Sequence, residues 1–158
     1  MIYKQSLTPQ QALQKLKHFC GYLERSHYET QQKLYSFGLY KKDVDMLLSQ
    51  LIEENYLNEE RYAIAFAGGR FRIKQWGKIK IKYELQQHKV SSYNITKALK
   101  CIDDLDYLNT LNSLAAKKWA ILKGEQYLTK QAKANSYLLQ KGFEQPLIST
   151  AISNLKKQ

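Results

Sequence analysis

One short phrase occurs three times in this chain, and its spacing constrains the fold more than any other feature. The copies occupy residues 34–39, 85–90 and 138–143, so their first residues lie 51 and 53 positions apart. A period of about fifty residues leaves room for several helices in each unit and indicates a tandem array. Arrays bury their core between neighbouring units and tend to be elongated. A β-branched residue follows each copy at the same distance: Val44, Ile95 and Ile148.

Capping signals and a low content of helix-breaking residues predict that these units are helical. Thr8 with Gln11, and Ser26 with Glu29, have the spacing of capping boxes at helix starts. Asn58 precedes two acidic residues and is a third expected N-cap. Gly (7) and Pro (2) are scarce, which disfavours a turn-rich β protein. The alternation over residues 79–83 could also be a strand, but the helical units around it favour a helix.

The ends of the phrases differ in one respect that bears on backbone geometry. Two copies end at a glycine, Gly38 and Gly142, which readily takes the left-handed conformation of a helix end. The middle copy has Lys89 instead, and a residue with a side chain pays a free-energy cost in that conformation.

Several classes of protein are not supported by the sequence. No stretch of eighteen apolar residues is present, so no membrane span is predicted. The start, residues 1–9, lacks the apolar run of a signal peptide, and we expect a cytoplasmic protein. Cys20 and Cys101 are 81 residues apart and are expected to be unpaired. No cofactor and no metal ion is predicted.

No catalytic arrangement is evident, and we predict a protein that is not an enzyme. The three histidines, His18, His27 and His88, are scattered and are expected to be structural or surface residues. The acidic pair Asp103 and Asp104 is explained by the start of the helix that follows.

The charge is the strongest indication of function. The chain has 25 Lys and Arg against 14 Asp and Glu, a net charge of +11. A basic protein of this kind is typical of nucleic-acid binding, although a solvated basic surface would also explain it. The candidate residues for binding DNA or another anionic partner come from a main basic group and a weaker second group: Arg70, Arg72, Lys74, Lys78, Lys80 and Lys82, then Lys117, Lys118, Lys130 and Lys133. Lys123 and Lys141 also belong to the weaker group, but they are not among the candidates.

Aromatic residues are interleaved with the main basic group. Phe71, Trp76 and Tyr83 could stack on bases while the cations neutralise phosphates. The alternative is that these rings face the core, and for Phe71 and Trp76 we favour that interpretation.

A run in the middle of the chain, together with the last phrase, has an order and spacing typical of one family. The run comprises residues 56–63, then Phe66, Arg70, Arg72, Trp76-Gly77, Ile79 and Glu84-Leu85. With the closing phrase at 137–143 and the Ile148 that follows it, this run resembles the RecX family. The resemblance covers most of the chain, from roughly residue 13 to residue 155. It departs from the family at Lys89, where a Gly is usual, and at Trp76, where a Lys is common.

The resemblance implies an all-α fold: three tandem three-helix repeats, helix-turn-helix-like, in an elongated, curved array. We divide the chain into an N-terminal helix at 1–25 and repeats at 26–77, 78–124 and 125–158. It further implies a monomeric bacterial regulator in DNA repair and the SOS response. Its partners would be RecA and the RecA–DNA filament, with direct contact to single- or double-stranded DNA left open. Binding would modulate, and most often inhibit, the recombinase, ATPase and coprotease activities of RecA.

Two other functions stay open at this point. One is a general DNA-binding helical module, although the helices after Gly38 and Lys89 do not present a convincing set of base-reading side chains. The other is a scaffold that binds a different acidic protein.

Overall fold

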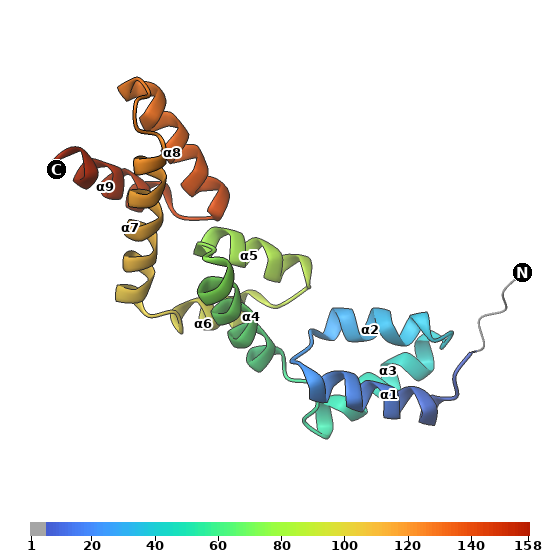
Figure 1. Cartoon of the computed structure of the whole chain (residues 1–158). Helices are drawn as coiled ribbons and strands as arrows, with labels where there is room; N and C mark the ends of the chain where they lie inside the picture. Colours follow the sequence, from blue (N-terminus) through green and yellow to red (C-terminus); the bar gives the residue numbers. More distant parts are fainter. Residues whose placement is uncertain (1–5) are drawn as a thin grey trace, which may run out of the picture. The chain divides into compact units, whose positions relative to one another are not determined.

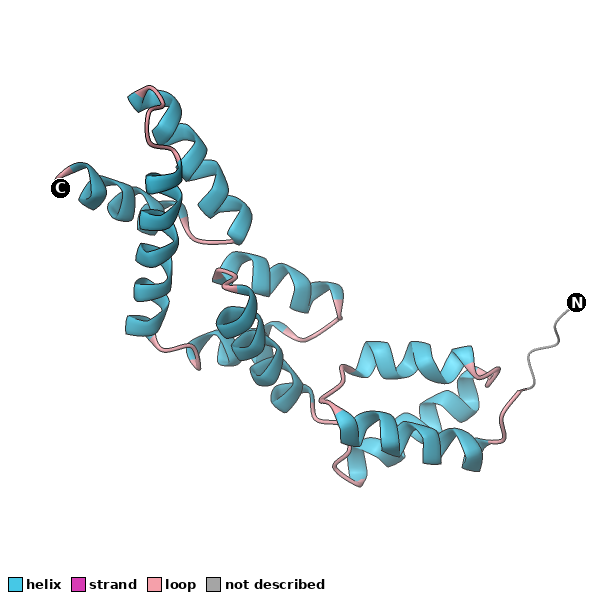
Figure 2. Cartoon of the chain, in the orientation of Figure 1, coloured by secondary structure: helices cyan, strands magenta, loops and turns pink. Residues whose placement is uncertain are grey.

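The computed structural model describes residues 6–158, which form helices and contain no strand (Figures 1 and 2). The signal-peptide prediction rests partly on residues 1–5, which lie outside the described residues. Within the described part, no helix is both long and apolar enough to cross a bilayer. The helices, in chain order, are α1 (Pro9–Tyr22), α2 (His27–Ser36), α3 (Lys41–Glu53), α4 (Glu59–Lys74), α5 (Lys78–Gln87), α6 (Ser92–Lys100), α7 (Asp104–Ile121), α8 (Tyr127–Lys141) and α9 (Gln145–Lys156).

The helix starts follow the capping signals of the sequence. The Thr8 hydroxyl accepts a hydrogen bond from the Gln11 amide, and the Gln11 side chain accepts one from the Thr8 amide. Ser26 and Glu29 make the same reciprocal pair at the start of α2. Asn58 caps α4 by accepting a hydrogen bond from the Arg61 amide. Both capping boxes and the Asn58 cap are therefore confirmed, as is the helical interpretation of residues 79–83, which lie in α5.

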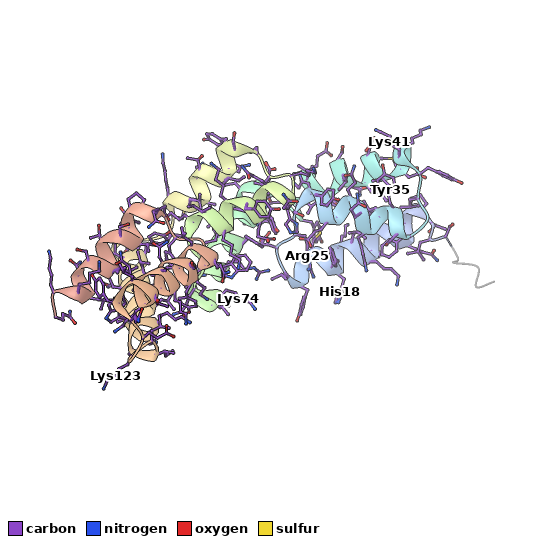
Figure 3. All side chains as sticks on the ribbon, turned by 90° about the horizontal axis from the view of Figure 1, so that it is seen from above. His18, Arg25, Tyr35, Lys41, Lys74 and Lys123 are labelled. Atoms are coloured by element: carbon purple, nitrogen blue, oxygen red, sulfur yellow. The ribbon has the colours of Figure 1, made fainter. Side chains whose placement is uncertain are left out.

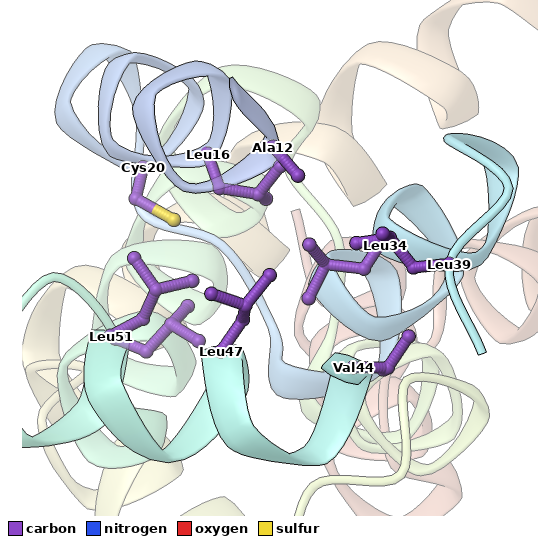
Figure 4. Packing of buried hydrophobic residues seen from close by; sticks show 9 residues of the cluster. Ala12, Leu16, Cys20, Leu34, Leu39, Val44, Leu47 and Leu51 are labelled. Atoms are coloured by element: carbon purple, nitrogen blue, oxygen red, sulfur yellow. The ribbon is translucent and has the colours of Figure 1, made fainter. Parts of the chain in front are cut away.

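Helices α1, α2 and α3 pack around one apolar core (Figure 4). Leu16 from α1, Leu34 from α2 and Val44 and Leu51 from α3 are fully buried in it. Burial of this apolar area is the main stabilising term for a three-helix group of this size. Helix α1 thus packs together with α2 and α3.

The three repeated phrases have the same backbone and burial pattern, which explains the repeat. Gly38, Lys89 and Gly142 all have positive φ angles of 84°, 60° and 98°. The leucine that opens each phrase is buried completely, and the apolar residue after the left-handed position is buried as well. The amides of Val90 and Phe143 donate to the carbonyl groups of Leu85 and Leu138, a bond typical of helix C-termini. Lys89 therefore keeps the geometry of the two glycines.

Helices α7, α8 and α9 form a second three-helix group, in which each helix packs against the other two. Their buried residues include Leu111 and Tyr107 of α7, Leu138 of α8 and Ile148 of α9. Contacts divide the chain into two units. One holds residues up to Ala65 together with Leu85–Lys97, and the other holds Phe66–Glu84 and Ala98–Gln158. The all-α repeat fold is confirmed, while the boundaries at residues 25, 77 and 124, and the elongated, curved shape, stay predictions.

Arg61 has a structural role at the start of α4. Its guanidinium pairs with Glu24 and donates to the side chain and carbonyl oxygen of Asn55. Two residues earlier, the Glu59 carboxylate accepts hydrogen bonds from the amide and hydroxyl of Ser91 and from the side chain of Asn94. These bonds connect the start of α4 to the start of α6.

Candidate functional site

The positive charge of the chain is concentrated in one of the two units. Of the 25 Lys and Arg residues, 15 fall in the unit formed by Phe66–Glu84 and Ala98–Gln158, together with 6 of the 14 acidic residues. That unit therefore carries +9 of the net charge of +11, and the other unit carries +2. The whole main group of candidate residues and the whole second group lie in the unit with +9.

Helix α4 presents two of the predicted cations on one face at its C-terminal end. Arg70 and Lys74 are four residues apart, which places them on neighbouring turns of the same face. The Arg70 guanidinium lies over the ring of Phe66, at 4.7 Å, and over that of Trp76, at 5.5 Å. Lys80 of α5 places its ammonium 4.5 Å from the centre of the Trp76 ring. Trp76 lies in the segment that joins α4 to α5 and is partly buried. Its ring therefore contacts one cation from each of these helices.

A third helix brings a further lysine to this position. Lys141, at the end of α8, donates a hydrogen bond of 2.9 Å to the carbonyl oxygen of Lys74. Burial lowers the pKa of Lys141 below its ordinary value, and the neighbouring charges of Lys80 and Lys74 lower it further. We call Arg70, Lys74, Lys80 and Lys141 the α4–α5–α8 cluster.

Backbone contact between two glycines sets the position of this cluster. The amides of Gly77 and Ile79, at the start of α5, donate to the carbonyl oxygens of Lys141 and Gly142, at the end of α8. A Cβ atom on Gly77 would lie 2.3 Å from the carbonyl group of Gly142, so only glycine fits there. Amides at a helix start and carbonyl groups at a helix end have no hydrogen-bond partner within their own helix. Here the amides at the start of α5 donate to the carbonyl groups at the end of α8, so both sets are paired.

Tyr107 fixes the first turn of α5 from the side of α7. Its hydroxyl accepts a hydrogen bond from the Lys78 amide and donates one to the Glu144 carboxylate. Burial raises the pKa of Tyr107 well above its usual range, and the bond to Glu144 acts in the same direction. The Lys78 ammonium lies 4.8 Å from the Tyr107 ring centre and 3.9 Å from the exposed Asp104 carboxylate. Lys78 is therefore partly engaged within the fold.

The other two members of the main group are exposed, and the structure does not place them in the cluster. The Arg72 guanidinium lies beside Gly68, one turn earlier in α4. Lys82 lies on the exposed side of α5. The predicted burial of Phe71 is confirmed, since only 7% of its surface is exposed. Trp76 is less buried than we predicted, because its ring supports the two cations instead of filling the core.

The second group of lysines makes separate contacts on α7 and α8. Lys118 lies over the Tyr137 ring and Lys130 over the Trp119 ring, at 5.0 and 4.2 Å from the ring centres. Lys133 forms an ion pair with Glu125, so part of its charge is compensated. Lys117 is exposed.

The chemistry of the α4–α5–α8 cluster is that of an anion site. Four cations from three helices converge, and two of them lower the pKa of a third. A phosphate group placed among them would relieve this repulsion and accept charge-assisted hydrogen bonds. Among the described residues, no group of three or more His, Cys, Asp or Glu side chains could hold a metal ion. Lys141, 67 residues after Lys74, is the cluster member that the candidate set omitted, although the weaker basic group contained it. Its place just before Gly142, at a predicted helix end, was the available signal.

The lowered pKa of Lys141 gives a prediction for its titration. We expect its ammonium to lose its proton at a lower pH than a lysine of an unfolded peptide. Because the unfolded chain binds this proton more tightly, the charged form lowers stability at every pH below the folded pKa. This cost disappears as the pH rises from the folded to the unfolded pKa. NMR of the lysine side-chain carbons would measure the titration.

Adding a short oligonucleotide should move the Lys141 titration to higher pH, since phosphate stabilises the ammonium form. A Lys141 that titrates at the unfolded value, or that does not respond to the oligonucleotide, would contradict the repulsion inferred for the cluster.

Two family models match this chain. The model of the RecX second three-helix domain matches residues 58–99, which hold α4, α5 and most of α6. The model of the RecX third three-helix domain matches residues 105–152, which hold all of α8 and most of α7 and α9.

Whole-chain comparisons agree with these models. Regulatory protein RecX of Prosthecochloris aestuarii (strain DSM 271 / SK 413) is 30% identical over 144 residues, covering 91% of this chain and 93% of that protein. Regulatory protein RecX of Clostridium tetani (strain Massachusetts / E88) is 31% identical over 128 residues, covering 77% of this chain and 58% of that protein. The crystal structure of RecX from Lactobacillus salivarius has the same fold, with a TM-score of 0.85 over 95% of this chain and 97% of that chain, at 23% identity. The chain therefore belongs to the RecX family.

Proposed function

We propose that this chain is a bacterial cytoplasmic regulator that binds RecA or the RecA–DNA filament as a monomer and inhibits its recombinase, ATPase and coprotease activities. Membership of a family of regulatory proteins supports this proposal. The single observation that carries it is the α4–α5–α8 cluster, where uncompensated cations converge in a unit of net charge +9. A nucleoprotein filament presents phosphates and acidic side chains to which such a cluster is complementary.

The mechanism that we propose is mechanical restraint. The protein contacts neighbouring protomers of the filament and hinders the change of shape that ATP hydrolysis along the filament requires. Its binding energy comes from several modest charge-assisted contacts and a few apolar anchors, as in other protein interfaces. No chemical step by this chain is needed.

The direct test follows ATP hydrolysis by RecA on single-stranded DNA while this protein is added. We expect the rate to fall as the protein is added and to reach a plateau when the filament is saturated. The control is heat-denatured protein at the same concentration, which keeps the charge but not the fold. A rate that does not change at saturating native protein would contradict the regulator proposal.

The cluster also favours direct contact with DNA, the second candidate function. A titration of oligonucleotide affinity against salt measures it, because each phosphate neutralised adds to the slope of log affinity against log salt. For three or four lysine and arginine contacts to single-stranded DNA, we expect a slope of about −2 to −3. A slope near zero would mean that the cluster does not neutralise phosphates, and that its partner is a protein rather than DNA.

A further inference from the structure

The unit that contains α1 has a cavity whose lining residues all precede those of the α4–α5–α8 cluster in the sequence. It measures about 680 Å³ and lies between α1 and α2. Figure 3 labels two of the residues that line it, His18 and Arg25. Basic and aromatic side chains predominate in its lining, which includes Lys15, His18, Phe19, Arg25, Lys33 and Phe37.

The cavity combines an apolar interior with a basic rim. The Arg25 guanidinium lies 3.8 Å from the centre of the Phe19 ring, and its Nε donates a hydrogen bond to the Phe19 carbonyl oxygen. Lys33 lies 5.9 Å from the Phe19 ring centre and 5.7 Å from that of Phe37. The described residues that line the cavity include no Asp or Glu. The three Lys and Arg residues of the rim, Lys15, Arg25 and Lys33, are thus not neutralised within the cavity wall.

Only the phenylalanines of the cavity lining help to hold the three helices together, because Phe19 and Phe37 pack against the edge of the core. The core of α1–α3 is formed by a different face of α1, with Ala12, Leu16 and Cys20 buried (Figure 4). Tyr22, which also lines the cavity, is 81% exposed. Packing of the core therefore accounts for the two phenylalanines, but not for the basic side chains that gather around them or for the exposed Tyr22.

We propose that this cavity binds an acidic peptide segment that carries one aromatic or aliphatic anchor residue. The anchor would enter between Phe19 and Phe37, and its flanking carboxylates would pair with Arg25 and Lys33. Arg25 is held for this role, because stacking on Phe19 and bonding to its carbonyl oxygen restrict the guanidinium before any ligand binds. Charge complementarity to a basic rim around an apolar interior selects a ligand with both features.

Nucleic acid fits this cavity less well, although it is also anionic. Binding of single strands depends on aromatic faces that are free to stack on bases. Here Arg25 lies over the Phe19 ring and Lys33 over the Phe37 ring, so one face of each ring already has a cation over it. The cavity would be a second binding site in the other unit of the chain, and it does not depend on the function proposed for the α4–α5–α8 cluster.

The test uses the full chain and a fluorescein-labelled peptide with one Phe flanked on both sides by Glu residues. We expect binding with a dissociation constant of about 100 μM, since a short flexible peptide loses conformational freedom when it binds. Its binding should shift the backbone amide signals of α1 and α2 in NMR spectra. Two matched peptides, one with Gln in place of Glu and one with Ala in place of Phe, should each bind at least about tenfold more weakly.

Charge reversal within the same unit provides the matched protein variants. Lys33→Glu changes an exposed side chain of the rim and should raise the dissociation constant about tenfold. Lys15→Glu tests the other wall and should have an effect in the same direction. Lys42→Glu makes the same charge change on exposed α3 outside the cavity, and its dissociation constant should stay within about twofold.

Three results would overturn the proposal. The first is that the peptide binds but shifts amide signals in other helices and not those of α1 and α2. The second is an equal loss of affinity in Lys33→Glu and Lys42→Glu, which would leave only a general effect of net charge. The third is a single-stranded oligonucleotide that shifts the signals of the cavity more strongly than the peptide does at equal concentration.

Discussion

Replacing Gly77 with alanine should destabilise the unit that carries the α4–α5–α8 cluster by about 3 kcal/mol, the largest effect that we expect from a single methyl group in this protein. The added Cβ would lie 2.3 Å from the carbonyl carbon and oxygen of Gly142 and 2.4 Å from the Phe143 nitrogen. These are backbone atoms, which cannot move aside as a side chain can. Relief of the clash therefore requires α5 to separate from the end of α8.

That separation would also break two hydrogen bonds of the backbone. The Gly77 amide donates to Lys141 at 2.7 Å and the Ile79 amide donates to Gly142 at 3.0 Å. Thermal unfolding monitored by circular dichroism should show a transition lowered by about 10 °C. Because the same contacts hold Lys80 beside Lys141, affinity for a polyanion should fall in this variant as well.

Gly69→Ala is the matched control for this variant. Gly69 lies inside α4, and a Cβ there would meet no atom within 4 Å. Alanine favours a helix interior by up to about 1 kcal/mol relative to glycine, so this variant should be as stable as the natural protein or more stable. If Gly77→Ala and Gly69→Ala unfold at the same temperature, the close approach of Gly77 to Gly142 does not require a glycine at position 77.

Local features of the fold could be predicted from the sequence because their causes are local. A capping box needs only two side chains three residues apart, so Thr8 with Gln11 was sufficient to place the start of α1. The repeated phrase predicted helix ends because it combines features of a helix C-terminus. One of its residues takes the left-handed conformation, and the apolar residues on either side of it, the leucine and the last residue of the phrase, are buried. The repeat also aligned Lys89 with the two glycines, and the structure shows that it has their left-handed geometry although its residue type disfavours it.

The candidate site could be predicted only in part, because its geometry depends on contacts between distant segments. The run from Arg70 to Lys82 identified the charge, but periodicity could not show that Lys141 joins Lys74 across 67 residues. Nor could it show that Gly77 lies against Gly142. Lys130 and Lys133 are three residues apart, a spacing that places them on one helical face. This spacing does not show that Lys133 forms an ion pair with Glu125, which lies before α8 begins. A pattern on one helix does not reveal which residue of another segment approaches it.

Reversing two charges of the cluster should separate binding from folding. In the double variant Lys74→Glu, Lys80→Glu, affinity for single-stranded DNA should fall about 100-fold at low salt. The slope of log affinity against log salt should decrease in magnitude by about 1.4, because two contacts to phosphates of a single strand are lost. Fluorescence anisotropy with a labelled oligonucleotide at several salt concentrations measures both quantities.

The same variant should remain folded, since the two substitutions relieve repulsion within the cluster. Lys74 and Lys80 both lower the pKa of Lys141, and two carboxylates in their place would favour the charged form of that lysine. The hydrogen bond from Lys141 uses the backbone carbonyl of residue 74, which the substitution leaves in place. Thermal unfolding should therefore occur at an unchanged or slightly higher temperature.

Lys100→Glu together with Lys123→Glu is the matched control, with the same change of net charge in the same unit and on exposed side chains. If binding depends on convergence of cations, the control should lose less than about a third of the salt slope that the cluster variant loses. Equal losses in both double variants would mean that DNA responds only to the net charge of the unit. An unchanged affinity in the cluster variant would place the anion-binding surface elsewhere, with Arg72, Lys82 and the lysines of α7 and α8 as the next residues to test.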